Sequence, residues 1–131
     1  MSTGESADAL AFDRYLAERR PTVAGAARAL RATVLAGFPG AVETFDPADG
    51  LLAIGLGRSM RDFRFAIIPH ASHVNLQLAD GADLPNPDGR IEGTGKRIRH
   101  VKVRSVGDAA APWLRAVIAA QLAHRGGEAS A

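Results

Sequence analysis

The sequence contains no cysteine, which excludes disulfides, thiol catalysis and metal centres held by cysteine. It also lacks any run of about 18 apolar residues, so we expect no membrane-spanning segment. Residues 1–8 are small and polar, without a basic region followed by an apolar core, so we expect no signal peptide. These absences predict a soluble, cytoplasmic protein that has no membrane partner.

Aromatic residues and lysine are scarce: the chain has five Phe, one Trp, one Tyr and two Lys, against fourteen Arg. Its net charge of +2 is too small to indicate nucleic-acid binding by itself. Residues 96–104 hold five Lys or Arg and one His in nine positions. Strand alternation would divide these charges between two faces, and the residues between them are aliphatic instead of stacking aromatics. Nucleic acid is therefore not an expected partner.

The 131 residues are 47% hydrophobic, which is enough for one domain with its own core. The hydrophobic period predicts helices over 7–18, 21–36 and 109–124. Between them it predicts strands over 42–45, 51–57, 63–68, 73–78 and 99–104. The short connections favour an antiparallel meander. We therefore predict an α+β two-layer sandwich over residues 1–131, with one sheet face covered by helices and loose ends at 1–5 and 125–131.

Two predicted strands alternate between apolar and polar residues. Val74 and Leu76 alternate with polar neighbours, and so do Val101 and Val103. We expect the helices to cover this apolar face. On the other face, small residues would lie beside polar ones: Ala53, Gly55, His73, Asn75, Gln77, His100 and Lys102. Space beside hydrogen-bonding groups is typical of a ligand site, although antiparallel sheets also commonly leave one face solvated.

We therefore predict a non-enzymatic binding domain whose polar sheet face holds a small anionic ligand or an acidic segment of a partner protein. Lysine would supply positive charge, histidine directional donors, and asparagine both a donor and an acceptor. Lys96 would lie at the rim, in a glycine-rich turn that can aim backbone N–H groups at an anion. The predicted ligand-binding residues are His73, Asn75, Gln77, Lys96, His100 and Lys102.

The turn Gly93–Lys96 is not a nucleotide-binding P-loop. The first glycine of that motif would fall at Arg90, and Arg97 stands where Ser or Thr would bind magnesium. No Gly-x-Ser-x-Gly nucleophile motif occurs either, so we predict no catalytic residues. An enzyme whose site assembles only in space stays an alternative.

His70 and His73 are three residues apart and could share a metal ion, with Asp46 or Asp62 joining through space. Zinc sites usually need three or four ligands and a supporting shell of hydrogen bonds. The spacing alone therefore predicts no metal site.

Three segments resemble the YdhG-like family of domains of unknown function: His-Val-Asn-Leu at 73–76, the loop at 81–89, and Glu-Gly-Thr-Gly-Lys-Arg-Ile-Arg-His-Val-Lys-Val-Arg at 92–104. The resemblance extends over about residues 10–124. It implies a frataxin-like fold, in which helices pack on an antiparallel sheet. The family includes a frataxin-like iron chaperone, so the resemblance also implies iron as the alternative ligand. No other cofactor is predicted.

Frataxins hold iron with carboxylates on an acidic helix and sheet edge. The first predicted helix here offers Asp8, Asp13 and Glu18, interspersed with arginines. Iron favours carboxylate and imidazole ligands, and a basic surface opposes its binding. Anion binding is therefore our first prediction and iron handling the second.

Overall fold

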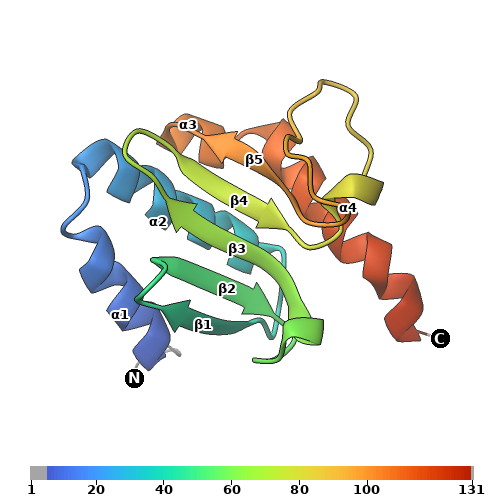
Figure 1. Cartoon of the computed structure of the whole chain (residues 1–131), viewed down its shortest axis with the longest axis horizontal. Coiled ribbons are helices and arrows are strands. Elements are labelled where there is room, and N and C mark those ends of the chain that lie inside the picture. The colour runs from blue at the N-terminus through green and yellow to red at the C-terminus, as the bar shows by residue number, and fades with distance from the viewer. Residues whose placement is uncertain (1–5, 131) are drawn as a thin grey trace.

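A five-stranded antiparallel sheet forms one layer of the structure, and helices form the other (Figure 1). The computed structural model describes residues 6–130, with side chains through His124. The strands are β1 (Val42–Asp46), β2 (Leu51–Gly55), β3 (Phe63–Pro69), β4 (Val74–Leu78) and β5 (Arg99–Val103). Each strand pairs with the next along the chain, in the order β1-β2-β3-β4-β5. The predicted α+β meander is confirmed.

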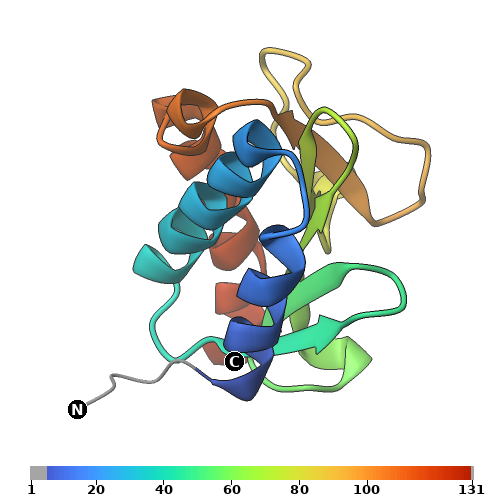
Figure 2. The same cartoon turned by 90° about the vertical axis from the view of Figure 1, so that its left-hand side faces the viewer.

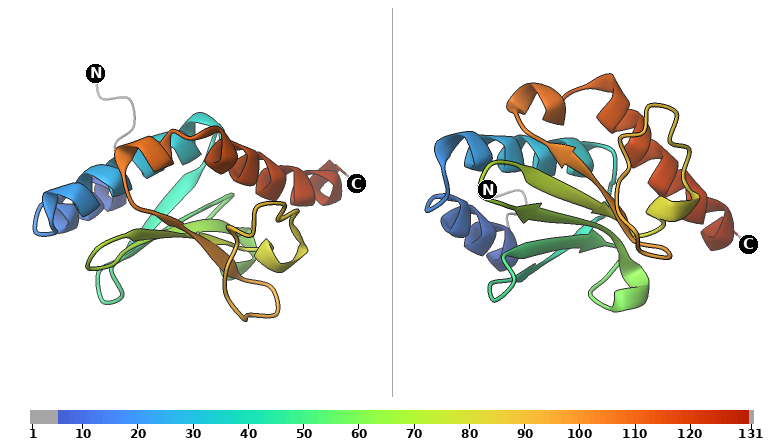
Figure 3. Two further views of the ribbon diagram at one scale, coloured as in Figure 1. Left: turned by 90° about the horizontal axis from the view of Figure 1, so that it is seen from above. Right: turned by 45° about the horizontal axis from the view of Figure 1, so that its top comes forward.

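The helices lie on one side of the sheet and leave the other side uncovered (Figures 2 and 3). They are α1 (Ala7–Leu16), α2 (Pro21–Ala36), α3 (Val106–Ala109) and α4 (Pro112–Ser130), with short 3₁₀ turns η1 (Met60–Asp62) and η2 (Gly81–Asp83). The Ser6 hydroxyl accepts a hydrogen bond from the Ala9 N–H and starts α1. Proline at the first position of α2 suits a helix start, where its missing N–H costs nothing. None of the helices in the described part of the chain is long and apolar enough to cross a bilayer.

The core lies between the helices and the covered face of the sheet. Val74, Leu76, Val101 and Val103 are fully buried there, as the alternation predicted. They pack in one cluster with helix residues such as Leu30. Burial of each such side chain contributes roughly 1.5–3 kcal/mol to folding. Because these side chains are covered by the helices, they are not available to bind a partner.

The second predicted strand is two residues too long. We predicted 51–57, but β2 ends at Gly55. Continued alternation would have placed Leu56 on the core face with Leu52 and Ile54, whereas Leu56 is 54% exposed. A bulge between Ile54 and Gly55 breaks the alternation. A Cβ at Gly55 would lie only 2.0 Å from the Asp62 carbonyl oxygen, so glycine is required at this crossing.

The last predicted helix is also different. We predicted 109–124, but the structure has the short α3, and α4 then starts at Pro112 and continues to Ser130. The Ser105 hydroxyl accepts a hydrogen bond from the Asp108 N–H, so α3 starts earlier than predicted. The first helix ends at Leu16 instead of residue 18. The loose segment predicted at 1–5, and residue 131, lie outside the described residues.

A buried polar pair ties the loop after β4 to α4. Gln121, on the apolar stripe of α4, is fully buried, and Asp80 is 2% exposed. The Gln121 amide donates to the Asp80 carboxylate at 2.7 Å, and its oxygen accepts from the Asp80 N–H at 2.8 Å. Arg97 donates to the same carboxylate at 2.8 Å. Because buried polar groups need partners, this network explains the glutamine in an otherwise apolar stripe.

Both edges of the sheet carry hydrogen bonds to other parts of the chain. At β1, the Phe45 N–H donates to the Asp8 carboxylate of α1 at 2.8 Å. At β5, Glu92 and His100 exchange two backbone hydrogen bonds, of 2.7 and 3.0 Å. The segment around Glu92 therefore lies along the outer edge of β5.

Candidate ligand-binding site on the uncovered sheet face

The strand register places four of the predicted residues in two cross-strand pairs. Asn75 of β4 lies opposite Lys102 of β5, and Gln77 lies opposite His100. They alternate with the buried residues of β4 and with Val101 and Val103 of β5, so all four side chains belong to the uncovered face. Directly opposed Cβ atoms in such pairs are roughly 5 Å apart. The four side chains therefore form a single patch.

His73 joins this patch through the turn between β3 and β4. The His70 N–H donates to the His73 carbonyl at 2.8 Å, which closes the turn. The two imidazole rings stack with their centroids 4.8 Å apart and 20° between their planes. The Asn75 amide nitrogen lies 3.2 Å from His70 Nε2. Which of the two nitrogens donates depends on the tautomer of His70.

The environment of His73 shows that cations converge here. Burial lowers the pKa of His73 below its ordinary value, and positive charge on His70, Lys102 and Arg104 lowers it further, whereas a hydrogen bond with Asn75 opposes the shift. Arg104, directly after β5, is two residues beyond Lys102 and is near enough to act on His73. An anion bound in this patch would favour the protonated form of His73.

A carboxylate of the chain itself already lies in the patch. Oε1 of Glu92 is 3.5 Å from the Lys102 Nζ and 3.6 Å from the His100 Nε2. Glu92 pairs with His100 across the edge of the sheet, and its side chain is 48% exposed. Lys102 and His100 therefore converge on one position that a carboxylate oxygen can occupy.

Lys96 does not join the other predicted residues. It is exposed in the turn between Glu92 and β5. Arg99 Nε donates to the Gly95 carbonyl at 2.8 Å, and a Cβ at Gly95 would come within 2.5 Å of the Ile98 carbonyl oxygen. The backbone of this turn is thus packed on itself, and no hydrogen bond or ion pair of the described residues links the Lys96 side chain to the patch.

A groove adjoins the patch on the same face. Its volume is about 260 Å³. Ala53, Ala66 and Gly55 line it, and Met60 of η1 and Ile98 lie at its sides. Gln77 belongs to both the groove and the polar patch. Small residues on β2 and β3 therefore leave space next to the polar row, as their positions on the sheet predicted.

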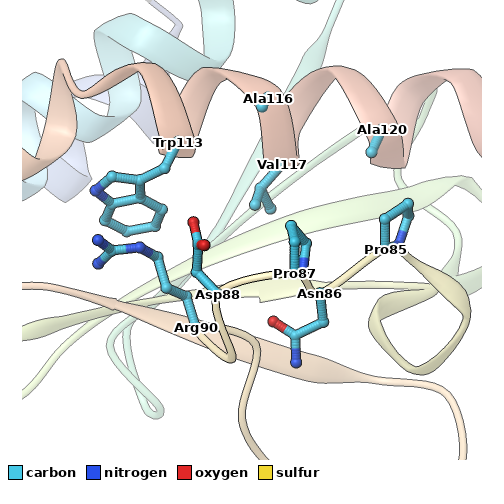
Figure 4. Close-up of a pocket in the computed structure, with 9 residues that line it drawn as sticks. All are labelled: Pro85, Asn86, Pro87, Asp88, Arg90, Trp113, Ala116, Val117 and Ala120. Atoms are coloured by element: carbon cyan, nitrogen blue, oxygen red, sulfur yellow. The ribbon is translucent and has the colours of Figure 1, made fainter.

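Two other cavities lie away from this face. One, also of about 260 Å³, is lined by the loop at 85–90 and α4 (Figure 4). Its Asn86 is bonded twice to Ile91, and the Arg90 guanidinium lies 4.3 Å from the centre of the half-buried Trp113 ring. The other, of about 500 Å³, lies between α2 and α4 and is lined mainly by alanines and aliphatic residues. Neither contains a predicted site residue.

The carboxylates considered for a metal site with His70 and His73 lie elsewhere. Asp46 accepts hydrogen bonds from its own turn, and Asp62 accepts one from Ser59. Among the side chains that the structure describes, residues 6–124, no three His, Asp or Glu group in a way that could hold a metal ion.

No family model, curated protein or solved structure matches this chain.

Sequence reasoning left three residues of the patch out of the predicted site. His70 was considered only as a metal ligand, although its place opposite His73 in a two-residue turn makes it a neighbour. Arg104 has the same strand parity as His100 and Lys102. Glu92 was named only as the first residue of the motif at 92–104. A hairpin centred on Lys96 would have paired it with His100.

Proposed function

We propose that this protein is a binding domain that holds a small organic carboxylate on the uncovered face of its sheet. The observation that carries the proposal is the position of the Glu92 carboxylate between Lys102 and His100. An external carboxylate placed there would meet the same two cationic or donor groups. Glu92 is half exposed and makes no core contact, so turning its side chain into solvent would leave the core intact.

The chemistry of the surrounding groups favours an anion. Lys102 carries a full charge, and His73 and His100 gain charge when protonated. Hydrogen bonds to charged groups contribute roughly 1.5–3 kcal/mol each, which is about twice the neutral value. Asn75 and Gln77 add uncharged donors that orient the ligand. Such a patch selects ligands by charge and hydrogen bonding and requires no metal.

The test is a titration of the protein with acetate, succinate and inorganic phosphate, followed through the imidazole resonances in NMR spectra. We expect shifts of the His100 and His73 signals and binding that Lys102→Ala weakens by about tenfold or more. Lys102→Ala should change the free energy of unfolding by less than about 0.5 kcal/mol, because Lys102 is on the surface. Arg14→Ala on α1, which also removes one positive charge, should leave binding unchanged.

The proposal is wrong if none of the three anions shifts these resonances, or if Lys102→Ala and Arg14→Ala behave alike. Membership of the YdhG-like family is a separate proposal, resting on the motifs at 73–76, 81–89 and 92–104. An anaerobic calorimetric titration with ferrous iron tests the alternative that the resemblance implies. A micromolar iron site lost in His70→Ala would place iron handling first.

A further inference from the structure

We infer that the ligand is an amphiphile: a monocarboxylate whose unbranched apolar chain lies in the groove next to the polar patch. This inference rests on the proposed function and names the class of ligand. It is carried by the continuity between the charged patch and the groove, which share the uncovered face of the sheet.

The groove is mostly apolar, whereas the adjoining patch is polar. Its floor includes Ala53 and Ala66, and its sides include Met60 and Ile98. Met60 is 81% exposed and Ile98 41% exposed, and Leu56, directly before a groove residue, is 54% exposed. Two of the five large exposed hydrophobic side chains among the described residues, Met60 and Ile98, thus line this one groove. Grouping of this kind marks a binding surface, whereas single exposed apolar residues do not.

The strand geometry sets the direction of the ligand. His100 and Lys102 follow one another on the same side of β5, about 7 Å apart. Ile98, directly before β5, lines the groove together with Gln77. When the carboxylate of the ligand lies between His100 and Lys102, the first methylenes of its apolar tail therefore lie next to Gln77 and Ile98. From there the apolar tail of the ligand continues across β3 and β2 towards Met60.

At the far end of the groove, the positive charge of Arg58 is balanced by nearby carboxylates. Arg58 lies 3.3 Å from the Asp8 carboxylate, and Asp46 accepts hydrogen bonds from the backbone of its own turn. The carboxylate of the ligand therefore binds at the end of the groove that adjoins the cationic patch, and not at the opposite end. The volume of about 260 Å³ is slightly below the roughly 300–1,000 Å³ of sites for drug-sized ligands. It suits a chain of several methylenes better than a large ring system.

The experiment is a series of calorimetric titrations with acetate, butyrate, hexanoate and octanoate, all below their micellar concentrations, and with 1-octanol. We expect affinity to rise about two- to fourfold for each methylene that enters the groove. Met60→Ser and Ile98→Ser should weaken octanoate binding at least fivefold and leave acetate binding unchanged. Leu10→Ser, which alters an exposed leucine of α1, is the matched control and should change neither. Lys102→Ala should weaken the binding of every acid, and octanol should bind far more weakly than octanoate.

The outcomes separate this inference from the proposed function. Equal affinity for all four acids, with a Lys102 dependence, would overturn the groove and leave the carboxylate site standing. Chain-length dependence that survives Met60→Ser and Ile98→Ser would also overturn it, because the chain would then lie elsewhere. Absence of binding by every acid would overturn both. Urea unfolding of each serine variant checks that it retains the fold, and both positions are exposed enough for that to be expected.

Discussion

Asp80 and Glu92 each place a carboxylate next to cationic side chains, but the first carboxylate is buried and the second is exposed to solvent. Asp80 is 2% exposed and lies 2.8 Å from Arg97, with the buried Gln121 bonded to both its carboxylate and its N–H. Glu92 is 48% exposed and lies 3.5–3.6 Å from Lys102 and His100. One carboxylate is enclosed by the protein, and the other faces solvent.

The difference shows which charge the fold depends on. Loss of a partner in a buried network leaves a polar group unable to turn to water, which is costly. Loss of an exposed ion pair usually changes stability by less than about 1 kcal/mol. Asp80 therefore stabilises the folded state, whereas another anion can replace the Glu92 carboxylate at little cost in stability. The following variants test that distinction.

The largest effect is expected from Gln121→Leu. The leucine is similar in size but cannot bond to the Asp80 carboxylate or N–H. We expect the free energy of unfolding to fall by about 2–4 kcal/mol, measured by urea denaturation, because the lost partners are buried. A loss below 0.5 kcal/mol would mean that the network is not structural.

Arg97→Ala should have a smaller effect, of about 1–2 kcal/mol, because the Arg97 side chain is 65% exposed although its partner is buried. The control is Arg28→Ala. Arg28 lies 2.7 Å from Asp13, but both side chains are largely exposed, so its removal should cost less than about 0.5 kcal/mol. Equal losses for the two variants would show that burial of the carboxylate does not matter here.

Glu92→Gln should leave stability within about 0.5 kcal/mol of the unaltered protein while binding carboxylates more tightly. Removal of a competing surface charge corresponds to about a two- to fivefold gain in affinity. Calorimetry with succinate measures the gain. Weaker binding in this variant would mean that Glu92 helps to hold the ligand instead of competing with it.

The smallest effect concerns pH. Because the folded-state pKa of His73 lies below its ordinary value near 6.5, the unfolded chain binds a proton more readily. This histidine therefore makes the fold less stable as the pH falls through 6.5, until the folded state is protonated as well. In His73→Gln, the decrease in unfolding free energy between pH 7.5 and 5.5 should be smaller, while His124→Gln on α4 serves as a control. An unchanged decrease would contradict this assignment.

The rows on β4 and β5 were predictable because strand alternation is a local property. Val74 and Val101 had to face the core, so Asn75 and Lys102 had to face away. The failures involve contacts between distant parts of the chain. Leu56 left the core because a bulge beside Gly55 ended the alternation. The partner of Gln121 lies 41 residues away. The position of Glu92 depends on the register of a hairpin, which the glycine-rich turn alone does not fix. The groove likewise requires η1 to approach Ile98.

The hydrogen bonds at the outer edges of β1 and β5 affect the tendency of the protein to aggregate at high concentration. An open edge strand is a template for pairing with other chains, and so for aggregation. Here an incoming strand would have to displace the Asp8 carboxylate from the Phe45 N–H at one edge, or the Glu92 backbone from His100 at the other. Each displacement breaks hydrogen bonds before new ones form. Strand-to-strand polymerisation is therefore opposed at both ends of the sheet by the chain itself.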